Sequence, residues 1–466
     1  MNQLLTPNQK VQLDNGLSCQ VEEFIGDGAQ GEVYQANVNG KPIALKWYYS
    51  KQVTPEHRSS IERLIKIGPP NDKFLWPLAL ATVKNVKGFG YIMPLRESHY
   101  KGIKDLMKRR IEPSFRALLT AGLELAHSFL QLHAKGLCYR DISFGNVFFE
   151  PNTGKILICD NDNVTIDGER KKSGILGTPR FMAPEIVSGA ATPNTQSDLF
   201  SLAVLLFYMM IIHHPLEGKK ESQIKCFDLP AMNKLYGSEP VFIFDPHNHS
   251  NHPVQGYHDN AMIHWPIFPQ SFRDLFTKAF TSGIRDPNNG RVRESEWRSM
   301  MVGLRDSIIY CEHCGLENFY DLDLLKMVGK LNPCWHCQKQ LKTPPRIRIE
   351  RQIVMLNHDT QLFPHHIEKN YDFSQAIAAV NQHPKNSNIW GLKISLQKVG
   401  LLIALMAQLK MCHRDKVSLY WQGQKSILAR HKGKFGFRSL AVVRSPRFIL
   451  GASSFVYNDE SGAWEF

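Results

Sequence analysis

The chain has 466 residues, of which 43% are hydrophobic and 21% charged, and its Lys and Arg exceed its Asp and Glu by 13. This length is too great for one ordinary core, so we expect two to four domains in a soluble globular protein. Residues 1–10 are polar, which predicts no signal peptide, and the longest apolar run, residues 399–409, is shorter than the about 20 residues that span a bilayer. We therefore expect a cytoplasmic protein that does not act at a membrane.

The positive charge is concentrated towards the C-terminal end. The last 69 residues contain 11 Lys and Arg against 4 Asp and Glu, and the rest of the chain is only mildly basic. A solvated basic surface is the commoner cause of such a bias, so nucleic-acid binding is not expected. Four of the nine cysteines form two Cys-x-x-Cys pairs, which favours a reducing compartment and a metal site over a disulfide framework.

Glycines mark the first segment that suggests a ligand site. A strand-compatible run, residues 19–25, leads into Gly26, Gly28 and Gly31. Glycine has no Cβ, so such a backbone can approach phosphate oxygens closely. A simple hairpin turn is the other interpretation. The strand-like run Ile43–Lys46 ends 15 residues after the last glycine, and the glycines lie between strands, whereas a dinucleotide-binding fingerprint would open a helix.

A helix and a further strand are predicted next. Apolar residues at helical spacing, among them Ile61 and Leu64, predict a helix over residues 55–67. Residues 91–95 predict a further strand, after which the chain leaves its N-terminal region. Pro94 has no N–H to donate there, so backbone contacts to a ligand would have to come from its neighbours.

Acidic residues and an asparagine follow an amphipathic helix predicted over residues 114–135. Asp141 and Asn146 stand five residues apart, directly before a strand-like run, and Asp160 follows the apolar run 156–159. An Asp that accepts a hydroxyl proton, with an Asn and an Asp that hold Mg²⁺, is the minimum needed to transfer a phosphoryl group. These residues therefore predict phosphoryl-transfer chemistry.

Later elements come in an order that resembles protein kinases. Gly177–Pro179 precedes Phe181–Glu185, Asp198 heads a very apolar helix, and Arg291 follows an Asp-Pro pair. Together with the glycines, the strand lysine and the acidic motifs, this order is similar to the protein kinase superfamily over some 250 residues. The resemblance implies that Asp198 braces the catalytic loop and that Arg291 forms a buried ion pair with Glu185.

The resemblance also implies a fold, cofactors and site residues. It implies an α+β bilobal fold with an N-lobe over residues 15–95 and a C-lobe over residues 96–305, and it implies ATP and Mg²⁺ as cofactors. The implied catalytic residues are Asp141, Lys46, Glu62, Asn146 and Asp160. The implied nucleotide contacts are Gly26, Gly28, Gly31, Val33, Ala44, Lys46, Met93, Leu95, Asn146 and Asp160. Of these, Asn146 and Asp160 would ligate Mg²⁺.

Lys46 would contact the α and β phosphates and be held by a carboxylate on the helix over residues 55–67. Glu62 and Glu56 are the two candidates, and the separation from Lys46 favours Glu62 because it is nearer that of the family. For either residue, a solvent-facing glutamate is the other interpretation.

Two departures from the kinase pattern bear on activity. Ser143 stands where the family usually has Lys, and Asn161-Asp162 replace the usual Phe-Gly. We expect a slower or less easily switched enzyme, and the alternative is a nucleotide-binding pseudokinase scaffold. Asp162 is interpreted as a solvated or capping residue, with a spare metal ligand as the alternative. A small-molecule kinase is disfavoured by the Gly-Thr-Pro and Ala-Pro-Glu elements. Ser173 is the first candidate phosphosite, with an ordinary loop serine as the other interpretation, and Arg140 could pair with an added phosphate.

Four cysteines form a separate module over residues 306–342. Two Cys-x-x-Cys pairs are separated by 19 residues, within the range of a zinc ribbon; they are Cys311, Cys314, Cys334 and Cys337. Each pair can present two thiolates to one tetrahedral ion, and four thiolates leave no open position. The spacing therefore predicts a structural Zn²⁺, with a redox pair as the less favoured interpretation.

The C-terminal part changes character along its length. Residues 343–393 contain short strand-like runs that predict a small β-rich domain. Residues 394–466 are atypical, and some codon choices restore turn-and-strand sequence in a shifted frame. We hypothesise that a frameshift after Leu392 replaced the native C-terminus; resequencing of the locus tests this.

A kinase domain followed by a zinc ribbon resembles the bacterial kinases of tellurium-resistance and stress-response loci. The sequences of residues 139–146, 160–164 and 242–246 are similar to that group. The resemblance implies Ser/Thr specificity, a protein substrate, and partners that are a PP2C-type phosphatase and a von Willebrand A-type protein.

Overall fold

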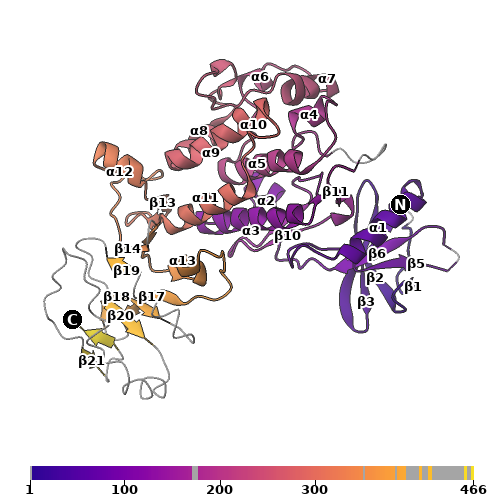
Figure 1. Ribbon diagram of the computed structural model, residues 1–466, viewed down its shortest axis with the longest axis horizontal. Helices are drawn as coiled ribbons and strands as arrows, with labels where there is room; N and C mark the ends of the chain where they lie inside the picture. The colour runs from indigo at the N-terminus through magenta and orange to yellow at the C-terminus, as the bar shows by residue number, and fades with distance from the viewer. Residues whose placement is uncertain are drawn as a thin grey trace. The chain divides into compact units, whose positions relative to one another are not determined.

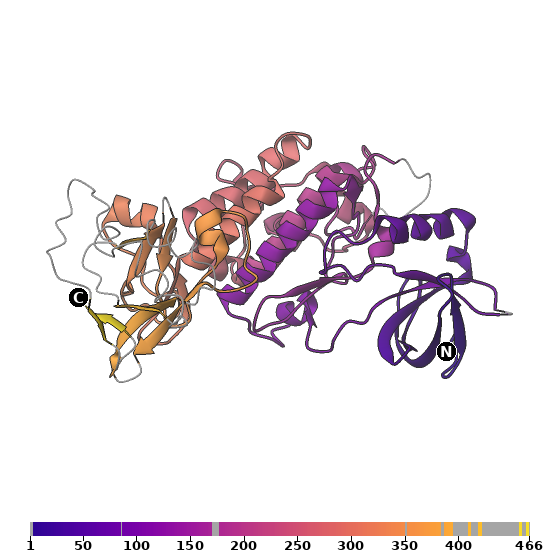
Figure 2. The same cartoon turned by 60° about the horizontal axis from the view of Figure 1, so that its bottom comes forward.

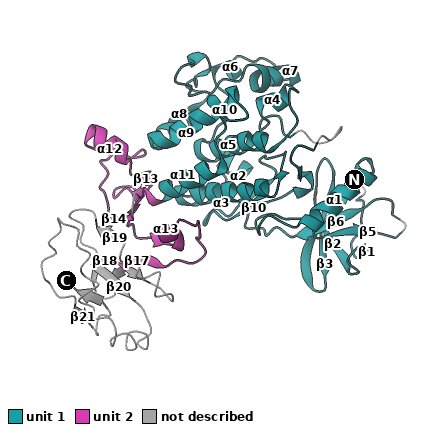
Figure 3. Ribbon diagram, in the orientation of Figure 1, with its two compact units in different colours: residues 1–305 teal, residues 306–466 magenta. Residues whose placement is uncertain are grey.

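The computed structural model describes residues 3–84, 86–169, 177–349, 352–383 and 386–394, together with four short strands in the remaining C-terminal part. The chain divides into two compact units, residues 1–305 and residues 306–466 (Figure 1 and Figure 3).

The N-terminal part of the first unit is a closed six-stranded barrel with the strand order β1-β2-β3-β4-β6-β5. Its strands are β1 (Lys10–Leu13), β2 (Ser18–Asp27), β3 (Gly31–Val38), β4 (Lys41–Tyr48), β5 (Ala79–Thr82) and β6 (Gly90–Pro94). Pairing of β1 with β5, with Gln12 opposite Thr82, closes the barrel. Figure 2 shows the barrel beside the helix α1 (Pro55–Ile67).

Alternation along β3 and β4 separates a core face from a second face. Tyr34, Leu45 and Trp47 belong to the buried apolar cluster of the barrel. Because successive side chains of a strand point to opposite faces, Lys46 lies on the other face. Val33 pairs with Lys46 in the β3–β4 register, so both belong to this second face.

The helix α1 follows from local signals and from its apolar face. Thr54 accepts a hydrogen bond from the backbone N–H of His57 at 3.1 Å, and Pro55 occupies the first turn. Ile61 and Leu64 are buried, which agrees with the predicted apolar face. The indole Nε1 of Trp76 donates to the carbonyl of Leu64 at 2.9 Å and ties the end of α1 to the following segment.

The rest of the first unit is mainly helical (Figure 1). The helix α3 (Phe115–Ala134) begins after Ser114, whose hydroxyl accepts from the N–H of Ala117, and it confirms the helix predicted over residues 114–135. The helix α5 (Thr195–Ile211) is buried along almost its whole length, as is typical of the central helix of a large core. The other helices are α2 (Ile103–Met107), α4 (Pro184–Val187), α6 (Lys219–Ser222), α7 (Leu229–Met232), α8 (Asp259–His264), α9 (Gln270–Phe280), α10 (Ser282–Arg285) and α11 (Glu294–Asp306).

Short strands lie in the segments between these helices. They are β7 (Lys101–Gly102), β8 (Leu137–Cys138), β9 (Val147–Phe149), β10 (Ile156–Ile158) and β11 (Thr165–Ile166). They form a three-stranded sheet of order β10-β9-β7 and a pair of β11 with β8. Within the described residues, no helix combines the length and the apolar character that crossing a membrane requires.

Among the residues that the structure describes, the second unit contains three sheets and two short helices. Its elements are β12 (Ile308–Tyr310), β13 (Glu317–Phe319), α12 (Leu322–Val328), β14 (Arg346–Ile349), β15 (Gln352–Met355), β16 (Gln361–Leu362), α13 (Pro364–Glu368), β17 (Ala378–His383), β18 (Asn386–Ile394), β19 (Leu409–Met411), β20 (Ser418–Trp421), β21 (Val456–Asn458) and β22 (Ala463–Glu465). The sheets have the orders β12-β13, β15-β14-β19 and β16-β17-β18-β20-β22-β21. The frameshift hypothesis concerns residues most of which lie outside those that the structure describes.

Candidate active site

Asn146 and Asp160 lie at the same end of a β-hairpin. In the antiparallel pair β9–β10, Val147 is opposite Ile158, so the residue before β9 and the residues after β10 are neighbours. The N–H of Cys159 donates to the carbonyl of Asn146 at 2.8 Å. The pairing therefore brings together the two residues that the sequence predicts as Mg²⁺ ligands. Asp160 also has a φ of +48°, a left-handed conformation that is costly for a side-chain-bearing residue and is concentrated at functional sites.

Asp141 lies beside Asn146 and is held from two sides. The amide Nδ2 of Asn146 donates to the backbone carbonyl of Asp141 at 2.8 Å and to its carboxylate at 3.2 Å. The hydroxyl of Thr178, in the Gly-Thr-Pro segment, donates to the other carboxylate oxygen at 2.8 Å. The Asp141 side chain is thus oriented by groups 5 and 37 residues away in the sequence.

The loop that contains Asp141 is held in place by a residue of α5. The carboxylate of Asp198 accepts from the N–H of Tyr139 at 2.5 Å and from the N–H of Arg140 at 2.9 Å. This confirms the predicted bracing role. Arg140 has a φ of +76°, and the two accepted N–H groups fix the backbone around this strained residue.

Asp198 in turn belongs to a buried charged cluster that was not predicted. The imidazole of His133 contacts Asp198 through Nε2 at 3.2 Å and Glu294 through Nδ1. Burial by itself would lower the pKa of His133, but the hydrogen bonds to the two carboxylates raise it to about 9. His133 is therefore a cation near neutral pH, and it balances the negative charge behind the Asp141 loop.

Lys46 reaches the same site from the barrel. Its Nζ lies 2.8 Å from one carboxylate oxygen of Asp162 and 3.1 Å from the other, and 3.3 Å from Asp160. Burial opposes the charged form of Lys46, yet the two carboxylates raise its pKa. Burial likewise favours the neutral acid at Asp162, but the Lys46 ammonium lowers the pKa of Asp162 below its ordinary value. The ammonium is thus charged and shared between two acids.

The expected pairing of Lys46 with Glu62 is wrong in this structure. Glu62 instead accepts from Arg58 one turn earlier on α1, at 3.1 Å, and its side chain is 49% exposed. Glu56, the second candidate, is also exposed. The helix turns its apolar residues inward, so both of its glutamates lie on the outer face.

The interpretation of Asp162 as a solvated residue is also wrong. Its side chain is fully buried, and besides Lys46 it accepts from the hydroxyl of Tyr48 at 2.6 Å. Asp160, two residues earlier, keeps 44% of its side-chain surface exposed. Of the two acids, Asp160 is therefore the one that solvent can reach.

The glycine segment forms the turn between β2 and β3, as predicted. The N–H of Gly28 donates to the carbonyl of Gly31 at 2.9 Å. A Cβ at Gly31 would lie 2.2 Å from the carbonyl oxygen of Trp47, so this glycine is required by the close approach of β4. Cβ atoms at Gly26 and Gly28 would meet open space, which leaves these two positions free to approach a ligand.

A glutamine of the same turn was missed by the sequence argument. The side-chain amide of Gln30 accepts from Lys46 at 3.0 Å and donates to Asn163 at 3.2 Å. The glycine turn is thereby held against the acidic loop. The glycine pattern leaves the residue type at position 30 unspecified, so the sequence carries no signal of this contact.

The remaining predicted nucleotide contacts share the second face of the barrel. Ala44 is opposite Met93 in the β4–β6 register, and Lys46 lies two residues further on the same face. Both Ala44 and Met93 are buried, and Leu95, directly after β6, is half-buried. Their positions permit contacts with a nucleotide, and these contacts stay predictions.

Asn146 and Asp160 both carry side-chain oxygens that can ligate a cation. Asn146 offers a side-chain carbonyl and Asp160 a partly exposed carboxylate, and hard cations such as Mg²⁺ prefer such ligands. The residues present therefore fit the Mg²⁺ that the sequence predicts. Ser143 is buried near this loop and brings no charge, while the candidate phosphosite Ser173 lies outside the described residues.

The four predicted cysteines come together in the second unit. The ligand atoms of Cys311, Cys314, Cys334 and Cys337 all lie within 4.8 Å of one another. Cys311 and Cys334 are buried. Four thiols in this arrangement fit one tetrahedral ion of the Zn²⁺ type.

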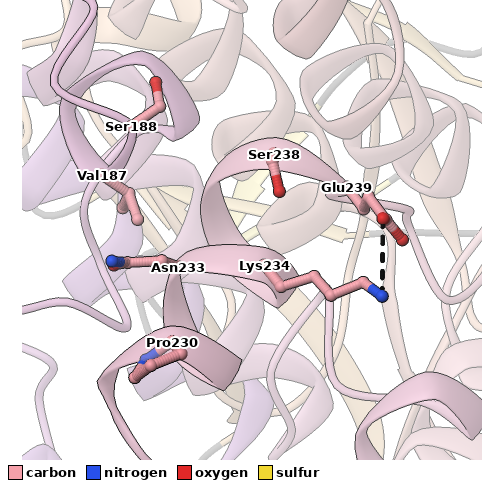
Figure 4. Close-up of a pocket in the computed structure, with 7 residues that line it drawn as sticks. All are labelled: Val187, Ser188, Pro230, Asn233, Lys234, Ser238 and Glu239. Carbon is pink, nitrogen blue, oxygen red and sulfur yellow. Dashed lines mark ion pairs between the residues drawn. The ribbon is translucent and has the colours of Figure 1, made fainter.

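A surface pocket of about 400 Å³ lies elsewhere in the first unit, at the end of α4 (Figure 4). Its lining consists of Val187, Ser188, Pro230, Asn233, Lys234, Ser238 and Glu239. The ammonium of Lys234 pairs with Glu239 at 3.6 Å across its edge. The pocket shares no residue with the cluster around Asp141 and Lys46, so it is not the site of the predicted chemistry.

Comparison with known proteins agrees with this geometry. The family model of the protein kinase domain matches residues 19–282. Protein kinase C delta type of Rattus norvegicus is 30% identical over 224 residues, which are 44% of this chain and 32% of the relative. Protein kinase MCK1 of Saccharomyces cerevisiae is 25% identical over 180 residues, 38% of this chain and 45% of the relative.

A third relative is a probable serine/threonine-protein kinase, CCRP1 of Zea mays, 26% identical over 150 residues, which are 30% of this chain and 24% of the relative. The chain spans less than half the length of each of these relatives. The family match nevertheless covers more than half of this chain, and it includes the glycine turn, Lys46, Asp141 and Asp160. The chain belongs to the protein kinase family.

Proposed function

We propose that this chain is an ATP-dependent serine/threonine protein kinase that phosphorylates a partner protein or itself. The observation that carries the proposal is the meeting of Lys46, Asp141, Asn146 and Asp160 in one site, with Asp141 oriented by Thr178. These are the groups that phosphoryl transfer requires, and they come from segments 14 to 114 residues apart.

Each of these residues has a chemical task in the proposed reaction. Asp141 accepts the proton of the substrate hydroxyl, because its carboxylate is held by Thr178 and Asn146 and needs no further ordering. Lys46 neutralises phosphate charge from the barrel side. Asn146 and Asp160 would hold Mg²⁺, which when bound offsets the charge that develops on the phosphate oxygens.

The proposed test is phosphate transfer from labelled ATP with Mg²⁺, to the chain itself and to a generic basic protein. Asp160→Ala and Asp141→Asn are compared with Asp72→Asn, an exposed acid on the same unit. We expect transfer by the wild type and by Asp72→Asn, and a loss of about 10²–10⁴-fold in Asp141→Asn. Identification of the labelled residue decides serine/threonine specificity. Equal transfer by wild type and Asp141→Asn would overturn the proposal.

The second candidate function is a nucleotide-binding pseudokinase scaffold. Ser143 favours it, because the family's usual lysine charge beside the catalytic loop is missing. The contact of Gln30 with Lys46 favours it as well, since the amide occupies one hydrogen-bonding direction of the ammonium. ATP binding without transfer by the wild type, also after addition of the partner proteins, would support the scaffold.

We further propose the organisation and setting that the sequence implies. The N-lobe covers residues 15–95, the C-lobe 96–305, a zinc ribbon 306–342 and a partial β-rich domain 343–393. The setting is bacterial stress signalling, with a PP2C-type phosphatase and a von Willebrand A-type protein as partners. Transfer of label to the von Willebrand A-type protein, and its removal by the phosphatase, would test both partners in one experiment.

A further inference from the structure

Lys46 receives its acidic partner from the loop after β10 and not from α1. Asp162 stands in the 3-10 helix Asn161–Asn163, directly after Asp160. Its two carboxylate oxygens lie 2.8 and 3.1 Å from the Lys46 ammonium. No glutamate of α1 takes part, because Glu62 is bound to Arg58 on the outer face.

The position of Asp162 is fixed by groups on both sides of the site. The Tyr48 hydroxyl, two residues after Lys46 on the same face of β4, donates to Asp162 at 2.6 Å. The side chain of the preceding Asn161 donates to the carbonyl of Ile158 at 2.9 Å, which ties the turn to the end of β10. Asp162 is therefore clamped between β4 and β10, and its carboxylate has little freedom.

The contacts of Asp162 argue against a second metal ligand. Both of its oxygens are engaged by Lys46 and one also by Tyr48, and the side chain is fully buried. A metal-bound carboxylate needs a free, approachable oxygen, which Asp160 offers with 44% of its side-chain surface exposed. The two acids of the loop thus have different surroundings: Asp160 is accessible to solvent, and Asp162 is bound to Lys46.

We propose that Asp162 is the positioning residue of Lys46, in the place of a carboxylate on α1. The proposal rests on the proposed function for its effect on turnover. Its consequence is that the lysine and the metal-binding acid Asp160 are placed by one and the same turn. Lys46 is then held for the phosphates without any movement of α1, whose buried residues include Ile61 and Leu64 and neither of its glutamates.

The test compares the two carboxylates that could hold Lys46. Asp162→Asn keeps the shape and removes the charge, and Glu62→Gln does the same on α1. We expect Asp162→Asn to lower kcat/KM about 100-fold, as misplacement of a catalytic group does, and to match Lys46→Met. Glu62→Gln is expected to stay within about twofold of the exposed control Asp72→Asn, since an exposed i,i+4 pair contributes little. A loss in Glu62→Gln as large as in Lys46→Met would overturn the proposal.

A double-mutant cycle isolates the coupling between the two residues. If Asp162 acts through Lys46, adding Asp162→Asn to Lys46→Met costs less than about threefold more, because the interaction is already absent. This double variant also removes the unpaired buried charge, so it stays informative if Asp162→Asn alone folds poorly. A loss in the double variant equal to the product of the two single losses would contradict the proposal.

Two further readouts separate the proposal from its rivals. Restoration of Asp162→Asn by a higher Mg²⁺ concentration, but not of Lys46→Met, would identify Asp162 as a metal ligand and overturn the positioning role. If the wild type transfers no phosphate, the proposed function has failed, but the dissociation constant of MgATP still reports on Lys46. In that case equal and non-additive weakening in the Lys46 and Asp162 variants supports the positioning role, and an unchanged Asp162→Asn refutes it.

Discussion

One nitrogen of the Arg291 guanidinium, Nη2, lies 2.8 Å from each of the two carboxylate oxygens of Glu185, although 106 residues separate them in the chain. The Arg291 side chain is almost fully buried, and its Nε and Nη1 donate to the carbonyls of Gly283 and Gln196. The pair thus ties the end of the Ala-Pro-Glu segment to α5 and to the segment after α10. It confirms the ion pair that the sequence predicts.

Removal of one partner of this pair is expected to be costly. Arg291→Leu leaves Glu185 without its cation and should lower the free energy of unfolding of the first unit by about 3–5 kcal/mol. Denaturant unfolding measures it. The matched control is Lys278→Gln, which breaks the partly exposed pair with Glu296 and should cost no more than about 1 kcal/mol. Similar losses of unfolding free energy in both variants would show that burial does not determine the cost of breaking the Arg291–Glu185 pair.

The His133 cluster should make stability depend on pH. Folding raises the pKa of His133 from 6.5 to about 9, so its contribution is fully present below about pH 6.5 and is lost as the pH rises through about 9. The lost contribution is of the order of 3 kcal/mol. Thermal unfolding of the wild type should therefore show a falling midpoint between these pH values.

His133→Gln tests the origin of that fall. This variant is less stable at neutral pH, because Asp198 and Glu294 lose their shared cation, and its midpoint should change much less between pH 6.5 and 9. The exposed His99→Gln serves as the control and should keep the wild-type profile. A His133→Gln profile parallel to that of the wild type would assign the pH dependence to other groups.

The cysteine cluster should hold one Zn²⁺ that stabilises the second unit. Cys334→Ser removes a buried thiol of the cluster, so we expect the bound zinc to be lost and the second unit to unfold at a lower temperature. Elemental analysis and calorimetry measure the two effects. Cys226→Ser, at an exposed cysteine of the first unit, should change neither. Phosphate transfer to a generic substrate should persist in Cys334→Ser, and its complete loss would assign the cluster a role beyond folding.

Gln30 is expected to restrain nucleotide entry. Its amide bonds Lys46 and Asn163, and these contacts have to break before a phosphate takes the amide's place. A typical hydrogen bond contributes about 0.5–1.5 kcal/mol, so Gln30→Ala should tighten MgATP binding about 2- to 10-fold. Calorimetric titration measures it against Gln35→Ala, which removes an exposed contact with Glu22 on β2. Weaker binding in Gln30→Ala would mean that the amide assists the nucleotide.

Local sequence patterns were sufficient to predict the part of the site that is formed by one hairpin and one loop. Asp141 and Asn146 are five residues apart in one loop, and the antiparallel pairing of β9 with β10 places Asp160 beside them. The periodicity of residues 114–135 and the N-cap at Ser114 sufficed for α3 in the same way. Such features depend on residues that are close to one another in the sequence. The one further requirement is the register of a single pair of strands.

The partners of Lys46 could not be found in this way. Glu62, Glu56 and Asp162 are all carboxylates near motifs, and their sequence separations do not say which way each one points. The apolar face of α1 packs inward and carries both glutamates outward, while the turn after β10 buries Asp162 against Tyr48. Gln30 was missed for the same reason, because an amide between glycines has no pattern of its own.

The sequence by itself therefore determined the family, the order of its elements, the acids and the asparagine of the catalytic loop, and the four clustered cysteines, since each depends on residue type at short and regular spacing. Only the tertiary structure decided which carboxylate holds Lys46, that His133 is a buried cation behind the Asp141 loop, and that Gln30 reaches across the site. Those contacts join segments 16 to 161 residues apart, and the orientation of packed elements, which no local period encodes, selects among chemically equivalent side chains.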